Sequence, residues 1–232
     1  MEQTVRRCRG LVASGQASQH VVLNAGKVNL MRDDPGLAEI IRGCALVNAD
    51  GMSVVWAGRL LGLPVPERVA GIDLMGRLLS EAETEGWPVY FLGARREVVE
   101  RFVETVRDRH PGLEIAGYRD GYFSDDRAVA DAIAASGARL LFVGISSPRK
   151  ERFLAEQLPR MGGLFAMGVG GSFDVWAGRT RRAPSWMQRT GLEWFYRFAQ
   201  EPGRMWRRYL VGNLRFAWLV LRARLRAPGG VA

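Results

Sequence analysis

Short apolar runs alternate with longer amphipathic stretches from residue 88 to residue 168, and this alternation constrains the fold more than any other sequence feature. The apolar runs predict strands at residues 89–92, 113–116, 140–143 and 164–167. Helical spacing of apolar residues predicts helices at residues 96–109, 125–136 and 148–158. Strands that alternate with helices of this length form a parallel sheet. We therefore predict an α/β fold, a Rossmann-like parallel sheet with helices on both faces.

The first 87 residues carry the same kinds of element in a less regular order. Apolar runs predict strands at residues 20–23 and 45–48, and helical spacing predicts helices at residues 4–15, 35–41, 52–61 and from 73 onward. Capping preferences give Asp34, Asp73 and Ser124 as the residues that begin helices. Together these elements predict an α/β body over residues 1–178.

Three of the predicted strands are followed directly by a glycine: Gly93, Gly144 and Gly168. Right-handed crossovers bring the carboxyl ends of parallel strands to one edge of the sheet. Glycine there lets a ligand approach the backbone, and the next helix N-terminus can bind an anion. Any one of these glycines can be an ordinary turn residue, but three at one edge favour a ligand crevice.

A carboxylate follows another predicted strand, in the run Val47-Asn48-Ala49-Asp50-Gly51. One interpretation is that Asp50 is the N-cap of the next helix. The other is that it handles a ligand at the carboxyl edge of the sheet, where α/β proteins bind their substrates. Taken alone, the pattern favours the N-cap.

The basic character of the chain is concentrated in residues 179–232. This stretch holds twelve arginines and two glutamates, a net charge of +10, against +9 for the whole chain. Tryptophans and phenylalanines alternate with the arginines, and Pro202-Gly203 divides the stretch into at least two helices. We predict a C-terminal helical appendage that docks on a membrane interface. A helical layer with a solvated basic face fits the same pattern.

Several classes of protein lack support in the sequence. Cys8 and Cys44 form no disulfide framework, and neither His20 nor His110 lies in a metal-ligand pattern. The N-terminus has no apolar signal region, and no apolar run is long enough to span a bilayer. The run 168–171 is not a dinucleotide fingerprint, and no strand ends in the Asp-x-Asp pair that grips a metal. A bound diphosphate would therefore be neutralised by helix N-termini and arginines.

From about residue 20 to residue 210, ordered motifs resemble those of the WecG/TagA/CpsF glycosyltransferase family. The resemblance rests on Val47–Gly51, Glu67–Met75, Phe91–Ala94, Gly121–Phe123, Val143–Glu151, Gly168–Asp174, Arg182–Trp186, Gly191–Arg197 and Glu201–Arg207. It implies an inverting transferase that needs no metal and no cofactor. The implied reaction moves a sugar from a UDP-sugar to a polyprenyl-diphosphate-linked saccharide at the cytoplasmic face of the plasma membrane.

The resemblance also implies roles for individual residues. Asp50 matches the general base, and Asn24 matches a second catalytic position. The implied donor-binding residues are Gly93, Gly144, Pro148, Glu151, Gly170, Gly171 and Asp174. Asp174 matches a residue that reads uracil, although a turn residue would fit there too. The implied acceptor- and diphosphate-binding residues are Arg68, Arg197, Arg204 and Arg207, whose guanidinium groups suit a diphosphate.

Two positions depart from the family pattern. Val22 replaces a threonine, so a hydroxyl group is missing near Asn24. Lys150 replaces a glutamine in the motif that begins at Pro148. Lys150 could alter the contacts to the donor, or it could be a solvated substitution.

The resulting hypothesis is a peripheral membrane glycosyltransferase of cell-surface or extracellular polysaccharide synthesis. Its expected partners are a UDP-sugar, a lipid-linked acceptor and anionic inner-leaflet lipid, and not nucleic acid. N-acetylmannosamine, its uronic acid and glucose are the candidate donor sugars. One alternative is a nucleotide-dependent oxidoreductase, and another is a non-enzymatic basic module that binds membrane or nucleic acid.

Overall fold

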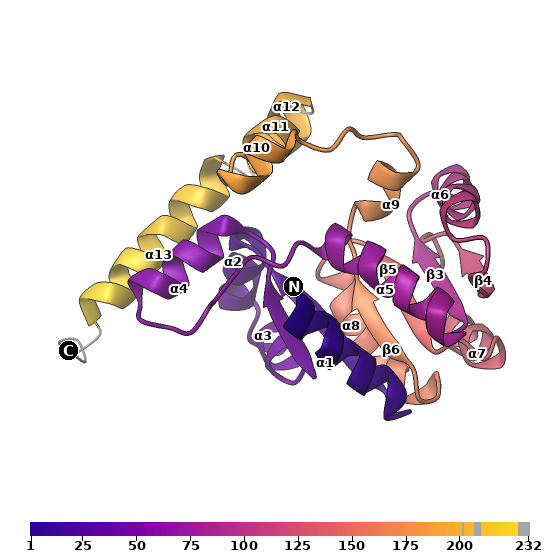
Figure 1. The fold of residues 1–232 in the computed structure, drawn as a ribbon. Coiled ribbons are helices and arrows are strands. Elements are labelled where there is room, and N and C mark those ends of the chain that lie inside the picture. The colour runs from indigo at the N-terminus through magenta and orange to yellow at the C-terminus, as the bar shows by residue number, and fades with distance from the viewer. Residues whose placement is uncertain (201, 207–209, 227–232) are drawn as a thin grey trace. The chain divides into compact units, whose positions relative to one another are not determined.

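The computed structural model describes residues 1–200, 202–206 and 210–226 (Figure 1). Contacts between residues divide the chain into two compact units that are discontinuous in sequence. The sheet unit contains Met1–Val22, Glu39–Val47 and Val69–Arg181, and the helical unit contains Leu23–Ala38, Asn48–Arg68 and Arg182–Ala232. The helical unit thus combines the C-terminal residues with two earlier segments of the chain. The predicted division into domains after residue 178 stays a prediction.

A six-stranded sheet runs through the fold in the order β2-β1-β6-β5-β3-β4. The strands are β1 (Ser18–Leu23), β2 (Leu46–Ala49), β3 (Val89–Gly93), β4 (Ile115–Arg119), β5 (Leu140–Gly144) and β6 (Phe165–Gly168). The pairs β1–β6, β6–β5, β5–β3 and β3–β4 are all parallel. The predicted α/β parallel sheet is therefore confirmed.

Helices cover both faces of the sheet in the sheet unit. One face packs against α1 (Glu2–Ala13), α5 (Gly71–Glu85), α6 (Arg96–Arg109) and α9 (Ser172–Trp176). The other packs against α7 (Asp126–Ala135), α8 (Arg149–Gln157) and the short η1 turn (Leu158–Arg160). Strand residues alternate between the faces, so that Val89 and Phe91 of β3 point to the first and Tyr90 and Leu92 to the second.

The helical unit forms around α2 (Ala25–Asp33), α4 (Met52–Leu60) and α13 (Gly212–Arg226). Their common core contains Ala25, Ala57 and Phe216. Arg215 of α13 pairs with Asp33 of α2, and both of its terminal nitrogens reach the carboxylate. The unit also contains α10 (Ser185–Arg189), α11 (Glu193–Gln200) and α12 (Pro202–Trp206), while α3 (Pro35–Arg42) is shared with the sheet unit.

Helix starts are where the sequence prediction and the structure differ most. Gly51, and not Asp50, is the N-cap of α4, and Asp125, and not Ser124, caps α7 by accepting from the Ala128 N–H at 2.9 Å. The N-cap of α5 is Ala70, so Asp73 lies inside the first turn.

Two elements were also misplaced or missed. Strand β4 begins at Ile115, two residues later than predicted, because it is an edge strand whose carboxyl half is polar and partly exposed. Helix α2 was not predicted, since it buries the polar residues Lys27 and Asn29 and shows no apolar periodicity. A helix whose buried residues are polar cannot be predicted from the spacing of apolar residues.

Candidate active site

The carboxyl ends of β3 and β5 mark the point where the sheet unit can hold a ligand. These strands are neighbours, with Gly93 in register with Gly144. Helix α6 follows β3 onto one face of the sheet, and α8 follows β5 onto the other. Neighbouring strands whose chains leave in opposite directions form a topological switch point, where open α/β sheets bind ligands.

The strand-end glycines at this point are required mainly by packing within the protein. A Cβ on Gly93 would lie 2.5 Å from the backbone of Gly144, and a Cβ on Gly144 would lie 2.7 Å from the Phe173 ring. Gly170 differs, because a Cβ there would meet nothing within 4 Å, and its φ of +54° suits glycine. Gly171 is the N-cap of α9. Of the glycines predicted to bind the donor, Gly170 therefore has open space beside it.

A shallow pocket of about 420 Å³ lies beside Gly93 at the start of α6. Its lining residues are Arg95, Arg96, Glu97, Asp120 and Tyr122. Ala94 adopts a φ of +57°, and its carbonyl accepts from the Gly121 N–H at 2.8 Å, which holds the loop from β4 against the end of β3. Tyr122 is 73% exposed, so its ring can stack on a planar ligand.

None of the five residues that line this pocket was predicted from the sequence to bind a ligand. A pair of arginines two and three residues after the strand-end Gly93, Arg95 and Arg96, was the signal that could have revealed it. Guanidinium groups and an exposed aromatic ring suit a ligand that is both anionic and planar.

Lys150 and Glu151, at the start of α8, form a buried ion pair. Lys150 is 5% exposed and Glu151 is 1% exposed, and their Nζ and Oε1 atoms lie 3.0 Å apart. The Ser147 hydroxyl donates to Glu151 at 2.9 Å and accepts from Lys150 at 2.6 Å. A Cβ on Gly168 would lie 2.6 Å from Lys150 Cε, so the lysine stem runs under the end of β6. The interpretation of Lys150 as a solvated substitution is therefore wrong.

Asp174 lies in the first turn of α9 and not in a turn outside a helix. Its backbone carbonyl accepts from the N–H groups of Arg179 and Thr180 at 2.9 and 3.1 Å. Two residues on, Trp176 stacks with His110 and lies under the Arg109 guanidinium. Trp176 therefore holds α9, which contains Asp174, against Arg109 at the end of α6 and against His110.

The helical unit brings the two predicted catalytic residues together. The Asp50 N–H donates to the Leu23 carbonyl at 2.8 Å, and a Cβ on Gly51 would lie 3.5 Å from the Asn24 Cβ. Asn24 Oδ1 accepts from the Lys27 N–H at 3.0 Å and so caps α2. This bond uses the amide oxygen of Asn24. The NH₂ group of the same amide is the end that can donate a hydrogen bond to a ligand oxygen. Val22, whose methyl groups lie 3.7 and 3.8 Å from a Cβ built on Gly71, is buried.

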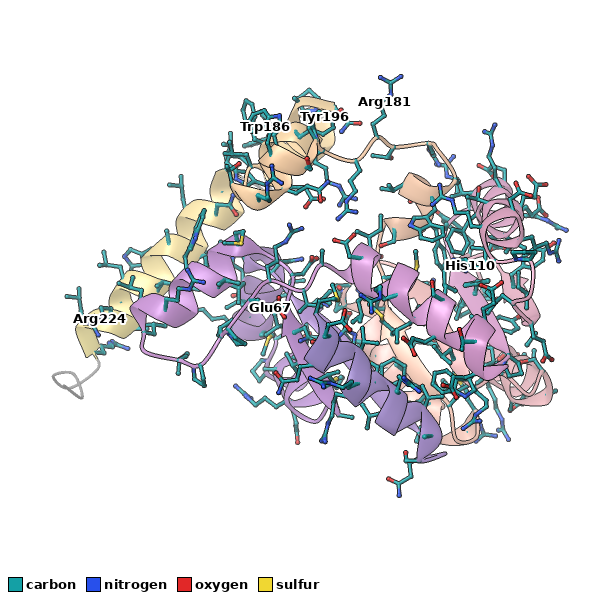
Figure 2. The ribbon with its side chains drawn as sticks, in the orientation of Figure 1. Glu67, His110, Arg181, Trp186, Tyr196 and Arg224 are labelled. Carbon is teal, nitrogen blue, oxygen red and sulfur yellow. The ribbon has the colours of Figure 1, made fainter. Side chains whose placement is uncertain are left out.

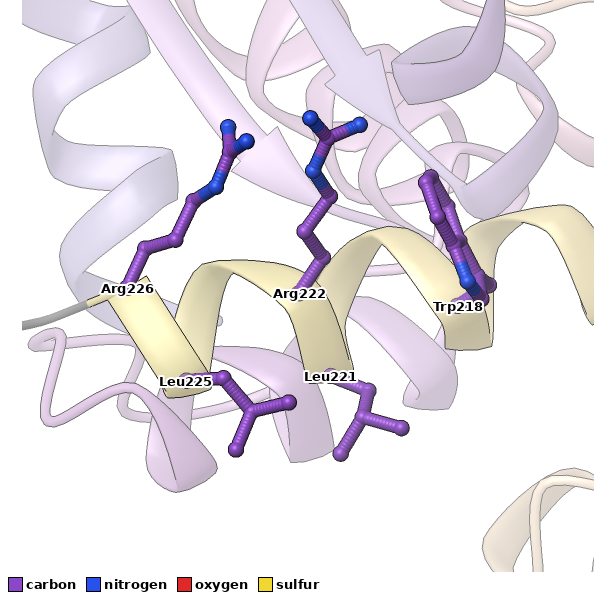
Figure 3. Close-up of a pocket in the computed structure, with 5 residues that line it drawn as sticks. All are labelled: Trp218, Leu221, Arg222, Leu225 and Arg226. Atoms are coloured by element: carbon purple, nitrogen blue, oxygen red, sulfur yellow. The ribbon is translucent and has the colours of Figure 1, made fainter.

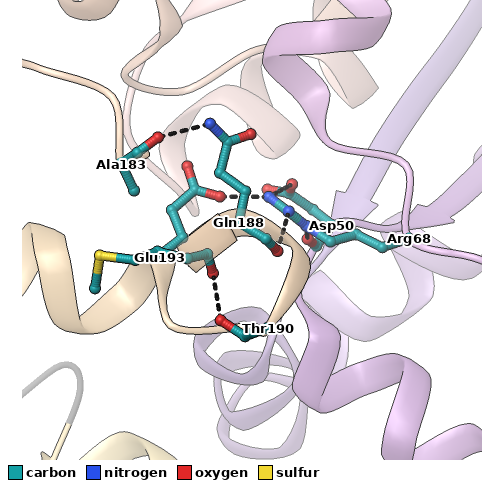
Figure 4. A network of polar contacts seen from close by, with 7 residues as sticks. Asp50, Arg68, Ala183, Gln188, Thr190 and Glu193 are labelled. Carbon is teal, nitrogen blue, oxygen red and sulfur yellow. Dashed lines mark hydrogen bonds and ion pairs between the residues drawn. The ribbon is translucent and has the colours of Figure 1, made fainter. Parts of the chain in front are cut away.

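Arg68 connects Asp50 to the C-terminal helices (Figure 4). Its Nε donates to the Asp50 carbonyl at 2.5 Å, and its Nη1 donates to the Gln188 carbonyl at 3.2 Å. Its Nη2 donates to Glu193 Oε2 at 2.5 Å and lies 3.9 Å from Asp50 Oδ1. Each of the three guanidinium nitrogens therefore donates to a protein group, and the predicted role of Arg68 at the diphosphate stays a prediction.

The predicted arginines of the appendage are described unevenly. Arg197 lies in α11 and is partly exposed. Arg204 lies in α12, but its side chain is outside the described part of the structure, as is the whole of Arg207. The predicted shared face of these last two arginines stays a prediction.

Helix α13 is amphipathic. Phe216 is buried against α2 and α4, whereas Leu214, Leu221 and Leu225 are exposed at helical spacing. Leu221, Leu225 and the arginines Arg222 and Arg226 line a hollow of about 350 Å³ together with Trp218, and Figure 3 shows the leucines and the arginines on different sides of the helix. The exposed side chains labelled in Figure 2 include Trp186 of α10 and Arg224 of α13.

The described residues contain neither a metal-binding cluster nor a membrane-spanning helix. No group of three or more His, Cys, Asp or Glu residues within residues 1–200, 202–206 and 210–226 is arranged to hold a metal ion. Over the same residues, no helix has both the length and the apolar character needed to cross a bilayer.

Comparison with known proteins gives the family. A model of the glycosyl transferase WecG/TagA/CpsF family matches residues 1–229. An N-acetylglucosaminyldiphosphoundecaprenol N-acetyl-beta-D-mannosaminyltransferase of Bacillus spizizenii is 41% identical over 177 residues, which cover 76% of this chain and 68% of the relative. A protein of the same description from Bacillus subtilis is 36% identical over 172 residues, which cover 74% of this chain and 67% of the relative.

The comparisons decide between the functional classes left open by the sequence. An oxidoreductase and a non-enzymatic basic module both disagree with a family match that extends over the sheet and the C-terminal helices alike. The chain therefore belongs to the WecG/TagA/CpsF family and is a glycosyltransferase.

Proposed function

We propose that this glycosyltransferase moves a sugar from a UDP-sugar to a polyprenyl-diphosphate-linked saccharide, with inversion at the anomeric carbon. The observation that supports the proposal is that the backbone of Asp50 and Gly51 lies against Leu23 and Asn24, and that Arg68 holds the Asp50 carbonyl. N-acetylmannosamine is the favoured donor sugar, ahead of its uronic acid and glucose, because both relatives are described as N-acetyl-beta-D-mannosaminyltransferases. Their description also supports an acceptor that carries N-acetylglucosamine on a polyprenyl diphosphate.

In the proposed reaction Asp50 acts as the general base. Its carboxylate takes the proton of an acceptor hydroxyl as the hydroxyl oxygen attacks the anomeric carbon of the donor sugar. The bond between that carbon and the diphosphate oxygen breaks on the opposite face, and UDP leaves with the bonding electron pair. Asn24 has an amide NH₂ group that can hold the attacking or the neighbouring oxygen in place.

The donor is proposed to bind at the switch point of the sheet unit. The pocket at the start of α6 offers Arg95 for the diphosphate and the exposed Tyr122 ring for the base. Gly170 leaves space for the backbone of the β6–α9 loop to approach the ligand, and Asp174 is proposed to read uracil. Charge on the departing UDP is neutralised by arginines and helix N-termini, so we propose that no metal or other cofactor takes part.

We propose that the C-terminal helices bind the membrane surface. The exposed leucines of α13 suit the acyl region of one leaflet, and Arg222, Arg224 and Arg226 suit anionic headgroups. This arrangement would make the protein a peripheral enzyme at the cytoplasmic face of the plasma membrane. Its product would enter cell-surface or extracellular polysaccharide.

A panel of UDP-sugars, each with a short-chain N-acetylglucosaminyl lipid diphosphate, tests the proposal. We expect the mass spectrum of the product to show one added N-acetylhexosamine with UDP-N-acetylmannosamine, and turnover to persist in excess chelator. Product from UDP-glucose alone would change the donor assignment. The absence of product with every donor, under conditions where UDP binds, would overturn the proposed reaction.

A further inference from the structure

Glu193 holds the guanidinium group on which the arrangement of Asp50 depends. It lies at the start of α11, and its Oε2 accepts from Arg68 Nη2 at 2.5 Å. Both side chains are largely shielded, with 17% of Arg68 and 24% of Glu193 exposed. A partly shielded ion pair with a short charge-assisted hydrogen bond is stronger than an exposed surface pair.

One nitrogen of Arg68 lies between two carboxylates that compete for it. Arg68 Nη2 is 2.5 Å from Glu193 but 3.9 Å from Asp50 Oδ1, which is beyond hydrogen-bond distance. Arg68 still touches Asp50, but through the backbone carbonyl and not through the carboxylate. Arg68 therefore forms its short ion pair with Glu193 of α11 and not with the Asp50 carboxylate.

We propose that Glu193 is a positioning residue, which holds Arg68 against the Asp50 backbone and keeps its short ion pair off the Asp50 carboxylate. The inference rests on the proposed function, in which Asp50 is the base. A carboxylate in a short bond to a guanidinium holds its proton less well and is a weaker base. Glu193 thus preserves the basicity that proton transfer requires.

The same contacts link the base to the docking of α10 and α11. The Gln188 carbonyl, near the C-terminus of α10, accepts from Arg68 Nη1, and carbonyls at that end of a helix attract cations. Two of the three groups that accept from Arg68 therefore come from residues 185–193. If these helices leave, Arg68 loses both, and the Asp50 carboxylate, 3.9 Å away, can replace them. Glu193 so makes the activity of Asp50 depend on the docked helices.

A double-mutant cycle on the full-length enzyme tests whether Glu193 acts through Arg68. E193Q keeps the size of the side chain and removes its charge. We expect it to lower kcat by at least roughly tenfold, with the donor KM within about threefold of wild type, and to change kcat less than about twofold in an R68A background. The matched control is D33N, which breaks the exposed Arg215–Asp33 pair between α2 and α13 and is expected to leave kcat within about twofold.

Equal effects of E193Q in both backgrounds, or an effect on KM alone, would overturn the proposal. If wild type turns over and E193Q matches it, the positioning role fails while the proposed function stands. Amide hydrogen exchange supplies a readout that needs no turnover. E193Q and R68A should each speed exchange in residues 185–200, and D33N should not; unchanged exchange in E193Q would refute the contact whether or not the wild type is active.

Discussion

Replacing Lys150 with methionine removes the cation from a buried ion pair and keeps an unbranched side chain under Gly168. The Glu151 partner is 1% exposed, so its charge has no route to solvent once the ammonium group is gone. Removing one partner of a buried pair costs about 3–5 kcal/mol. In a protein of this size, 1 kcal/mol shifts Tm by about 2–4 °C, so K150M is expected to melt roughly 6–20 °C below wild type.

Two companion variants separate the charge from the hydrogen bonds. K150Q keeps a donor for Ser147 and Glu151, and we expect it to cost about 1–2 kcal/mol. The double variant K150M/E151Q removes both charges and should recover more than half of the K150M loss. Thermal melting of the full chain by circular dichroism measures all three. A K150M protein that melts within about 1 °C of wild type would show that Glu151 is solvated and would refute the reasoning.

Three further predictions concern the proposed donor pocket, the proposed membrane-binding surface and the pH dependence of stability. R95A should raise the KM for the UDP-sugar about tenfold or more, the loss of one charge-assisted contact, with kcat nearly unchanged in steady-state kinetics. L221E/L225E should lower binding to anionic vesicles at least roughly tenfold in a co-sedimentation assay, because two exposed leucines can no longer enter the apolar region of the bilayer. Equal binding by the variant and the wild type would show that this face of α13 does not contact the membrane. Hydrogen bonds from His110 and from the Gly112 N–H lower the pKa of Glu83 below its usual 4.5. A lowered folded-state pKa stabilises the protein above the unfolded-state pKa, and this stability is lost as pH falls through the folded value. E83Q should therefore melt below wild type at pH 7, and the difference should shrink as pH falls below 4.5 through the lowered folded-state pKa of Glu83.

The sheet was predictable because its strands are apolar on both sides. β3, β5 and β6 are buried along nearly their whole length, so each reads as a continuous apolar run bounded by glycine. The edge strand β4 lacks this signature, which explains its displacement by two residues. Helix α2 was not predicted because its buried residues include the polar Lys27 and Asn29, so it lacks an apolar periodicity.

The sequence indicated a candidate role for each residue of the site, and these roles stay predictions, but it did not show the contacts between the residues. The motif around Asp50 gave a candidate for the general base, yet nothing local showed that Arg68 would bond to Gln188 and Glu193, which are 120 and 125 residues away. A pattern of capping residues also misassigned Asp50 itself, since the cap position falls one residue later, on Gly51. Loss of the capping role removes the main structural explanation for a carboxylate at this position.

Lys150 shows how burial changes the meaning of a substitution. In the sequence a lysine in place of glutamine suggested either a new ligand contact or a solvated side chain. The structure gives a third explanation, in which the ammonium group neutralises Glu151 beneath the end of β6. Pairing of this kind depends on the distance between side chains in space, which sequence spacing alone does not give.

The rate of D50N tests the central claim most directly. The substitution keeps the size of the side chain and the backbone contacts to Leu23 and Arg68, and it removes the carboxylate that we propose as the base. With UDP-N-acetylmannosamine and a lipid-diphosphate acceptor, we expect kcat to fall by about 10²–10⁴ while UDP binding is retained. Turnover by D50N within about threefold of wild type would contradict the assignment of Asp50 as the general base.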